Sequence, residues 1–205
     1  MIQAIVFDLG GVLVDLDLEA CTRAFLDILG NRRITQLLDP CHQKGIYGDM
    51  EAGLITADEF RRRVLAESRP GSRPEDVDRC MAALLAGMAP EKVTLLQELS
   101  ARYPLYALSN NNDISMARFH TLFDELGLDW RNIFREEFIS SRMKMTKPSS
   151  EIFEEAVRRI GVPPGDILFI DDSQRNVDGA RSVGIRSALY RPGTDLKACV
   201  EANLP

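Results

Sequence analysis

Five short runs of mostly apolar, β-branched and aromatic residues divide the chain, and each ends in a polar or glycine-containing turn. They are Ala4–Phe7, Leu105–Leu108, Glu137–Ile139, Ile167–Ile170 and Arg186–Tyr190. Near-continuous apolar runs of this length are typical of strands that are buried on both faces. The chain is therefore expected to fold around a parallel sheet that is covered by helices on each side.

Helical patterns separate most of these runs in the second half of the chain. They span Glu91–Arg102, Asp113–Leu126, Ser150–Ile160 and Gln174–Val183. Because strand and helix alternate from there to the end, the sequence predicts an α/β fold built on a Rossmann-like, doubly wound parallel sheet.

The stretch from residue 16 to residue 89 interrupts this alternation. It holds helical patterns and no convincing strand; the patterns cover Leu18–Leu29, Ile34–Leu38, Ala57–Glu67 and Glu75–Leu85. A length of 205 residues lies between the usual sizes of one domain and of two. We therefore predict an α/β core made of residues 1–15 and 90–205, with an inserted α-helical cap over residues 16–89.

The charge balance narrows the range of partners. Asp and Glu total 31 against 25 for Lys and Arg, which gives a formal net charge of −6. An acidic chain repels nucleic acid and anionic lipid surfaces, so we expect neither nucleic acid nor a membrane as a partner. A small phosphorylated substrate remains compatible with this charge if a metal ion or local cations bind it. Nothing in the sequence indicates the oligomeric state.

The sequence also argues for a cytoplasmic protein. No apolar run approaches the roughly 20 residues that span a bilayer, and the N-terminal stretch lacks the basic region of a secretory signal. The cysteines are far apart, with no metal-binding spacing, and are expected to be reduced; they are Cys21, Cys41, Cys80 and Cys199.

Polar and acidic residues follow three of the predicted strands directly. They are Asp8, Gly10 and Gly11 after the first, Ser109 and Asn110 after the second, and Asp171 and Asp172 after the fourth, while Lys147 precedes the helix at Ser150. In open α/β sheets the active site lies beyond the carboxyl ends of the strands. We therefore expect these groups to converge on one edge of the sheet.

Three carboxylates at one edge would repel one another, and a hard divalent cation would remove that repulsion. Mg²⁺ prefers oxygen ligands, and Lys147 could neutralise the remaining charge and bind a phosphoryl group. Each residue also has an ordinary structural explanation, because Asp171, Asp172 and Ser173 before a helix are compatible with a simple N-cap. The combination and order of these groups favour a functional site.

Four stretches, in their order along the chain, resemble the motifs of the haloacid dehalogenase superfamily. They are Phe7–Leu13, Leu108–Asn110, Lys147–Pro148 and Phe169–Asp172. The resemblance covers almost the whole chain, and the helical block between the first two motifs is similar to the C1-type cap of that superfamily. The first motif is similar to that of bacterial sugar-phosphate phosphatases and of the phosphatase domain of epoxide hydrolases.

The resemblance implies a Mg²⁺ site at the sheet edge. Asp8 would be the nucleophile that forms an aspartyl-phosphate, and its other oxygen and the Gly10 backbone carbonyl would bind the metal. Asp172 would be a direct metal ligand, with Asp171 acting through water or binding Lys147.

The resemblance also implies a phosphate-binding site. Ser109 and the backbone of Asn110 would hold the phosphoryl oxygens. Lys147 would orient Asp8 and offset negative charge.

One position departs from the family pattern. Phosphatases of this family usually carry a second aspartate two residues after the nucleophile as general acid and base, and here that position is Gly10. General acid–base assistance is typically worth about 10²–10⁴-fold, so a slower phosphatase is expected unless a water, Asn176 or a cap residue replaces the missing group. Asp15 and Asp17 are expected to cap the first cap helix.

Several cap residues are candidates to face the site, although most of them are equally compatible with core or surface positions. They are His42, Tyr47, Met50, Glu51 and Arg61–Arg63.

Three functions remain open from the sequence. The first is a Mg²⁺-dependent phosphohydrolase acting on a small phosphorylated metabolite such as a sugar phosphate. The second is a catalytically silent protein that binds a phosphorylated ligand or partner, which Gly10 favours. The third is a 2-haloacid dehalogenase, which needs neither the Asp171–Asp172 pair nor a general acid but usually has an aromatic residue after its nucleophile.

Overall fold

A five-stranded parallel sheet forms the centre of the protein in the computed structural model, which describes residues 1–33 and 45–204. The central strand β1 (Ala4–Phe7) is flanked on one side by β4 (Leu105–Ser109) and β5 (Phe134–Ile139), and on the other by β6 (Ile167–Asp171) and β7 (Arg186–Leu189). The predicted doubly wound parallel sheet is confirmed.

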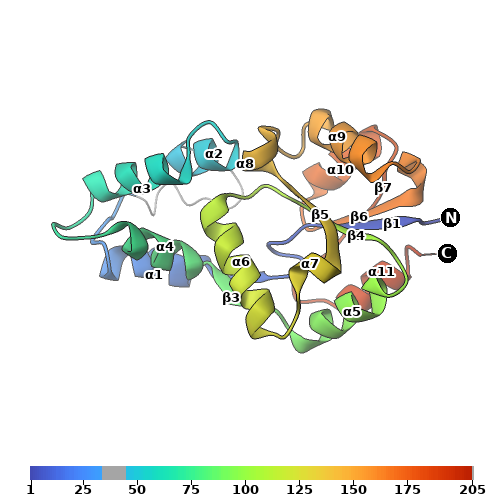
Figure 1. Cartoon of the computed structure of the whole chain (residues 1–205), viewed down its shortest axis with the longest axis horizontal. Coiled ribbons are helices and arrows are strands. Elements are labelled where there is room, and N and C mark those ends of the chain that lie inside the picture. Colours follow the sequence, from blue (N-terminus) through green and yellow to red (C-terminus); the bar gives the residue numbers. More distant parts are fainter. Residues whose placement is uncertain (34–44, 205) are drawn as a thin grey trace.

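Alternate side chains of the strands build a separate apolar core on each face of the sheet. Ile5 and Phe7 belong to one core, and Val6 belongs to the other. Helices α5 (Pro90–Ser100), α6 (Asp113–Glu125) and α11 (Leu196–Glu201) contribute to the first core, and α9 (Ser150–Ile160) and α10 (Gln174–Ser182) to the second (Figure 1). Both faces of β1 are therefore buried, as its unbroken apolar sequence predicts.

Short elements connect the larger ones. They are α7 (Trp130–Ile133) before β5, α8 (Ser140–Met143) directly after β5, and the 3-10 turn η2 (Pro164–Asp166) before β6. Strand β5 begins at Phe134, three residues before the predicted run, because backbone pairing with β4 extends it across the charged residues Arg135 and Glu136.

The helical block lies beside the sheet, at the left of Figure 1. It contains α1 (Leu18–Asp27), α2 (Gly45–Glu51), α3 (Ala57–Ala66) and α4 (Pro74–Ala82). These helices enclose an apolar core of their own, which includes Phe25, Phe60 and Val77. Ile34–Leu38, Cys41 and His42 lie outside the described residues, and the three described cysteines are free thiols.

A small antiparallel ribbon joins the block to the sheet, and here the prediction that the segment contains no strand is wrong. Strands β2 (Asp15–Leu16) and β3 (Leu85–Gly87) pair where the chain enters and leaves the block. Strands of two and three residues are too short to show a period in the sequence. The predicted helix Glu75–Leu85 accordingly ends at Ala82.

The two aspartates at the entry to the block have different roles. Asp17 caps α1, as predicted, because its Oδ1 accepts a hydrogen bond from the backbone N–H of Ala20 at 2.8 Å. Asp15 instead forms an ion pair with Lys92 at 2.8 Å. The expectation that Asp15 is also a cap is therefore wrong.

Two contacts hold the helical block against the rest of the protein. Ile114 of α6 belongs to the apolar core of the block. Two residues beyond α2, Gly53 has a φ of +69°, and a Cβ there would lie 2.3 Å from the carbonyl oxygen of Ser141. Since only glycine allows this approach, the segment after α2 packs directly on α8. Among the described residues, no helix is both long and apolar enough to cross a lipid bilayer.

Candidate active site

Asp8 follows the central strand, at the point where the strand order reverses. From β1 the chain builds outward through β4 and β5, and it then returns to build β6 and β7 on the other side. Such a switch point is where ligands bind in open α/β sheets. The Asp8 N–H donates to the Ile170 carbonyl at 2.9 Å, and Asp8 Oδ1 accepts from the N–H of Leu9 at 2.7 Å. The carboxyl group is thus held in a fixed orientation at this edge.

The turn after Asp8 brings a second carboxylate close. Gly11 has a φ of +79°, and a Cβ at Gly11 would lie 2.3 Å from Oδ2 of Asp172. A side chain at this position would collide with the carboxylate as well as strain the backbone. Glycine at position 11 therefore allows the turn to pack directly against the Asp172 carboxylate.

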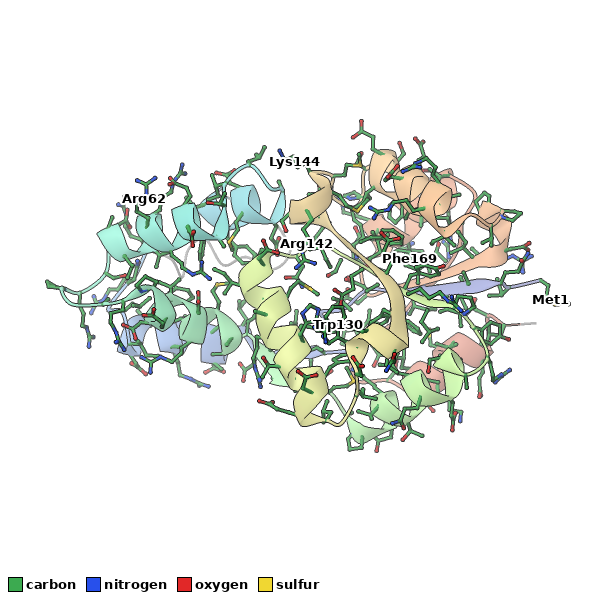
Figure 2. All side chains as sticks on the ribbon, in the orientation of Figure 1. Met1, Arg62, Trp130, Arg142, Lys144 and Phe169 are labelled. Carbon is green, nitrogen blue, oxygen red and sulfur yellow. The ribbon has the colours of Figure 1, made fainter. Side chains whose placement is uncertain are left out.

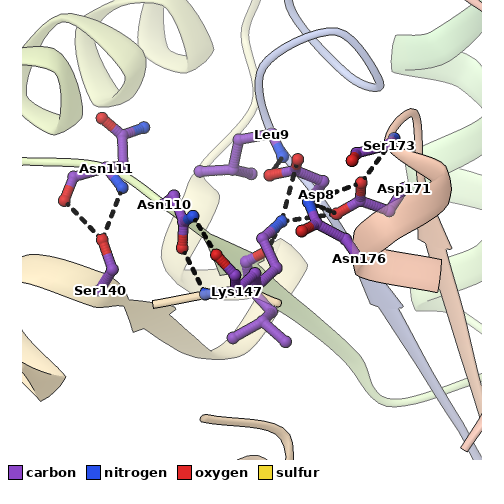
Figure 3. Close-up of polar contacts among 10 residues, drawn as sticks. Asp8, Leu9, Asn110, Asn111, Ser140, Lys147, Asp171, Ser173 and Asn176 are labelled. Carbon is purple, nitrogen blue, oxygen red and sulfur yellow. Dashed lines mark hydrogen bonds and ion pairs between the residues drawn. The ribbon is translucent and has the colours of Figure 1, made fainter. Parts of the chain in front are cut away.

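Lys147 lies between two of the aspartates (Figure 3). Its Nζ is 2.9 Å from Asp8 Oδ2 and 2.6 Å from Asp171 Oδ2, and it donates to the Leu108 carbonyl at 2.9 Å. Burial alone would lower the pKa of Lys147, but Asp171 and Asp8 raise it above its usual value. The ammonium group therefore stays charged beside Asp8.

Asp171 is fixed by several donors besides Lys147. Its Oδ1 accepts from the N–H of Ser173 at 2.8 Å and from Asn176 Nδ2 at 3.0 Å. The Asn176 amide also lies 3.1 Å from Asp171 Oδ2. An amide that orients Asp171 has no acidic proton to transfer, so the geometry argues against Asn176 as a substitute for the missing general acid.

The three aspartates fit a divalent cation. Asp8, Asp171 and Asp172 each offer a carboxylate oxygen within 4.8 Å of the others. Burial raises the pKa of Asp8 to about 7, with Asp171 and Asp172 acting in the same direction and Lys147 opposing them. Burial and Asp171 also raise the pKa of Asp172. One buried ammonium group does not balance the negative charge of three carboxylates, so the cluster favours a bound cation. Since all the donor atoms are oxygens, a hard cation such as Mg²⁺ suits the site.

Ser109 and Asn110 end the neighbouring strand. Ser109 is the last residue of β4 and is buried. The Asn110 side chain binds the backbone of Lys147, accepting from its N–H at 2.8 Å and donating to its carbonyl at 2.9 Å (Figure 3). This clamp on the Lys147 segment is a role that we did not predict, since no sequence pattern links the two positions.

The cap candidates divide into two groups. Arg61 pairs with Asp78 and Asp58, and both Arg62 and Arg63 pair with Glu59. Arg62 extends outward from α3 (Figure 2). The structure therefore does not bring this arginine run to Asp8.

Residues of α2 are placed differently. Met50 is buried in the core of the block, and Tyr47 and Glu51 are buried as well. Burial raises the pKa of Glu51 to about 8; a hydrogen bond with Tyr47 opposes this rise and the charge of Asp8 adds to it. The Ser140 hydroxyl, directly after β5, donates to the backbone carbonyl of Glu51 at 2.6 Å, so the end of α2 lies at the carboxyl edge of the sheet.

A Rossmann-like sheet that gathers buried carboxylates and a lysine at its switch point, beside a helical insertion, defines a class of hydrolases. The family of haloacid dehalogenase-like hydrolases matches residues 2–184, and the chain belongs to this family. The family predicted from the four motifs is therefore confirmed.

Two similar proteins cover nearly the whole chain. A D-ribitol-5-phosphate phosphatase of Bacteroides thetaiotaomicron is 30% identical over 196 residues, which is 95% of this chain and 95% of that protein. A crystal structure of a haloacid dehalogenase family enzyme from the same organism, in complex with magnesium and inorganic phosphate, has a TM-score of 0.87 and 32% identity. That alignment covers 95% of this chain and 97% of the other.

A haloacid dehalogenase is also similar in fold. The L-2-haloacid dehalogenase of Xanthobacter autotrophicus has a TM-score of 0.63 and 23% identity, with 92% of this chain and 77% of that chain covered. A likeness at this identity shows the shared fold alone.

Proposed function

We propose that this protein is a Mg²⁺-dependent phosphohydrolase that removes the phosphate group from a small phosphorylated metabolite. The observation that carries the proposal is the buried Asp8 carboxylate, 2.9 Å from Lys147 and within one cluster with Asp171 and Asp172. The similar D-ribitol-5-phosphate phosphatase, and the similar structure that holds magnesium and inorganic phosphate, support a magnesium-dependent hydrolase of phosphate monoesters.

The metal would be held by Asp8, the backbone carbonyl of Gly10 and Asp172. Asp171 would contact the metal through a water molecule rather than directly, because its oxygens already accept hydrogen bonds from Lys147, Ser173 and Asn176. When bound, Mg²⁺ would offset the negative charge of the carboxylates and of the phosphoryl group.

Asp8 would act as the nucleophile. One of its carboxylate oxygens attacks phosphorus, the bond to the leaving-group oxygen breaks, and an aspartyl-phosphate forms. Lys147 fixes the orientation of Asp8 and balances its charge, while Ser109 and the Asn110 backbone would hold the phosphoryl oxygens. Phosphoryl transfer depends mainly on such positioning and charge stabilisation.

The helical block of residues 16–89 would serve as the cap that selects the substrate. Relatives named for D-ribitol 5-phosphate and for N-acetylmuramic acid 6-phosphate favour a phosphorylated sugar or polyol. These compounds therefore lead the panel of substrates to be tested.

A second candidate rests on Gly10. If the missing aspartate has no substitute, the protein would bind a phosphorylated ligand or partner without turning it over. Retained ligand binding without hydrolysis would distinguish this case.

Phosphate release from a panel of phosphomonoesters, measured with Mg²⁺ and with EDTA, tests the proposal. We expect turnover only with Mg²⁺, loss of turnover in Asp8→Asn, and wild-type rates in the control Asp178→Asn, which changes an exposed carboxylate on α10. Halide release from 2-haloacids in EDTA would instead establish a dehalogenase. If neither assay shows turnover and the protein still binds a phosphorylated ligand, the second candidate, a binding protein without catalysis, would be favoured.

A further inference from the structure

The proposed phosphohydrolase needs a proton donor that the core does not supply, and the inference below rests on that proposed function. When the bond between phosphorus and an alkoxide breaks, the leaving oxygen must gain a proton. Asp8 is the nucleophile, Lys147 is paired with two aspartates, and Gly10 has no side chain. The donor is therefore a water molecule or a side chain from elsewhere in the protein.

Glu51, the last residue of α2, is anchored at the edge of the sheet where Asp8 lies. The Ser140 hydroxyl donates to the Glu51 carbonyl at 2.6 Å. Ser140 directly follows β5, and its Oγ also accepts from the N–H of Asn111, beyond the end of β4, at 2.9 Å. Since β1, β4 and β5 are parallel, these residues all lie at the carboxyl edge of the sheet.

The Glu51 carboxyl group is buried yet incompletely bonded. The side chain of Tyr47, one helical turn earlier, forms a hydrogen bond with it. Its Oε2 atom is buried and accepts no hydrogen bond from any residue that the structure describes. A buried carboxyl oxygen without a partner is costly, which indicates that a ligand or reacting group completes it.

The charged groups that influence Glu51 are those of the catalytic edge. Across the boundary between the block and the sheet, they are Asp8 and Lys147. On its own helix it faces Tyr47, which in turn is influenced by Cys21 of α1. Because the Glu51 backbone is bonded to Ser140 at the sheet edge that also carries Asp8, a phosphoryl group bound at Asp8 would have Glu51 on its cap side.

We propose that Glu51 is the general acid and base of the reaction, in place of the aspartate that Gly10 lacks. In the first step Asp8 bonds to phosphorus, the bond to the leaving oxygen breaks, and the Glu51 proton passes to that oxygen. In the second step a water oxygen attacks phosphorus, one water proton passes to the Glu51 carboxylate, and the bond to Asp8 breaks. The products are the alcohol and inorganic phosphate, and both carboxyl groups return to their starting states.

The protonation state of Glu51 suits the first step. Burial is the largest of the influences that raise its pKa to about 8, with Asp8 acting in the same direction and Tyr47 and Lys147 opposing it. Glu51 is therefore protonated at neutral pH, as a leaving-group acid must be.

The test compares two esters that differ in their need for a proton. p-Nitrophenolate leaves readily without protonation, whereas the alkoxide of a sugar or polyol phosphate does not. In Glu51→Gln we expect kcat/KM for the alkyl ester to fall by about 10²–10⁴-fold, and kcat/KM for p-nitrophenyl phosphate to fall far less. We also expect a burst of p-nitrophenol, because the variant lacks the base for the second step.

Controls separate this role from a structural one. Glu67→Gln, an exposed cap glutamate paired with Arg33, should leave both esters at wild-type rates. Gly10→Asp in the Glu51→Gln background should restore turnover of the alkyl ester. If Glu51→Gln is poorly folded, the conservative Glu51→Asp variant should show the same ester selectivity in a weaker form.

An equal loss on both esters, or no loss on either, in a wild-type protein that is active would overturn the role of Glu51. A wild-type protein inactive on both esters with Mg²⁺ would overturn the proposed function itself, and the inference with it.

Discussion

The ammonium group of Lys147 lies 2.6 Å from Oδ2 of Asp171, and both side chains are fully buried. A buried ion pair of this kind is held by the groups around it. Here the Leu108 carbonyl accepts from Lys147, and Asn176 donates to Asp171. The pair therefore fixes Lys147 beside Asp8 before any ligand binds.

Replacement of Lys147 should damage both stability and activity. In Lys147→Met the buried Asp171 loses its counter-charge, and removing one partner of a buried pair typically costs about 3–5 kcal/mol. We expect urea denaturation to show a loss of this size and phosphatase activity to disappear. Lys197→Met, which breaks an exposed pair with Glu98, should cost less than about 1 kcal/mol. Equal effects of the two variants would contradict the buried role.

Gly11→Ala should abolish activity through a collision with Asp172. The added Cβ would lie 2.3 Å from Asp172 Oδ2, so either the turn or the carboxylate must move. Gly193→Ala is a matched control, since Gly193 has a φ of +83° with open space around it and carries the same backbone strain without the collision. We expect the backbone strain to cost each variant about 1–2 kcal/mol, with an additional loss of stability from the collision, and loss of Mg²⁺-dependent turnover, in Gly11→Ala alone.

Gly10→Asp should be tolerated and should accelerate the reaction. Gly10 does not have a positive φ, and an added Cβ would lie 3.3 Å from a terminal carbon of Leu16, a side chain that is 42% exposed and able to move. We expect kcat for an alkyl phosphate to rise by less than about 10²-fold, because Glu51 already supplies part of the acid–base assistance. A loss of activity in a well-folded variant would mean that the backbone at Gly10 cannot accept a side chain.

The strand ends were predictable from the sequence. Asp8, Ser109 and Asp171 each follow an apolar run, and parallel strands bring their carboxyl ends to one edge. The contacts that organise this edge were not predictable. Asn110 clamps a segment 37 residues away, and the Lys147 ammonium bonds a carbonyl 39 residues away. No local pattern encodes such distances.

Glu51 shows a second limit of sequence interpretation. A glutamate at the end of a helix normally suggests a solvated position, and the sequence made it one of several cap candidates. Its burial follows from the docking of α2 on α8, which depends on Gly53 and Ser140. The ribbon of β2 and β3 was missed for a related reason, because its stability comes from pairing two distant short segments.

Mg²⁺ should stabilise the protein through the carboxylate cluster. A ligand present at about 100 times its dissociation constant adds about 2.7 kcal/mol to the free energy of unfolding. We expect Mg²⁺ to raise the Tm of the EDTA-treated wild type and to have much less effect on Asp172→Asn. Asp178→Asn should respond like the wild type. An unchanged Mg²⁺ response in Asp172→Asn would exclude Asp172 as a metal ligand.

The raised pKa of Glu51 predicts how its replacement changes the pH dependence of stability. Between the ordinary glutamate pKa of 4.5 and the raised pKa of about 8, the folded protein keeps the Glu51 proton while the unfolded chain releases it. The unfolded state then binds fewer protons, so this group makes the folded state less stable as pH rises through that window.

Glu51→Gln removes this ionisation while preserving the shape of the side chain. Each unit of pKa difference corresponds to about 1.4 kcal/mol, so the variant should gain up to a few kcal/mol relative to the wild type between pH 5 and about 8, roughly the span of the shift. Urea denaturation in EDTA at several pH values measures this difference, with Glu67→Gln as the control. A constant difference across the range would mean that Glu51 titrates normally in the folded state, and a carboxylate already ionised at neutral pH could not protonate a leaving group.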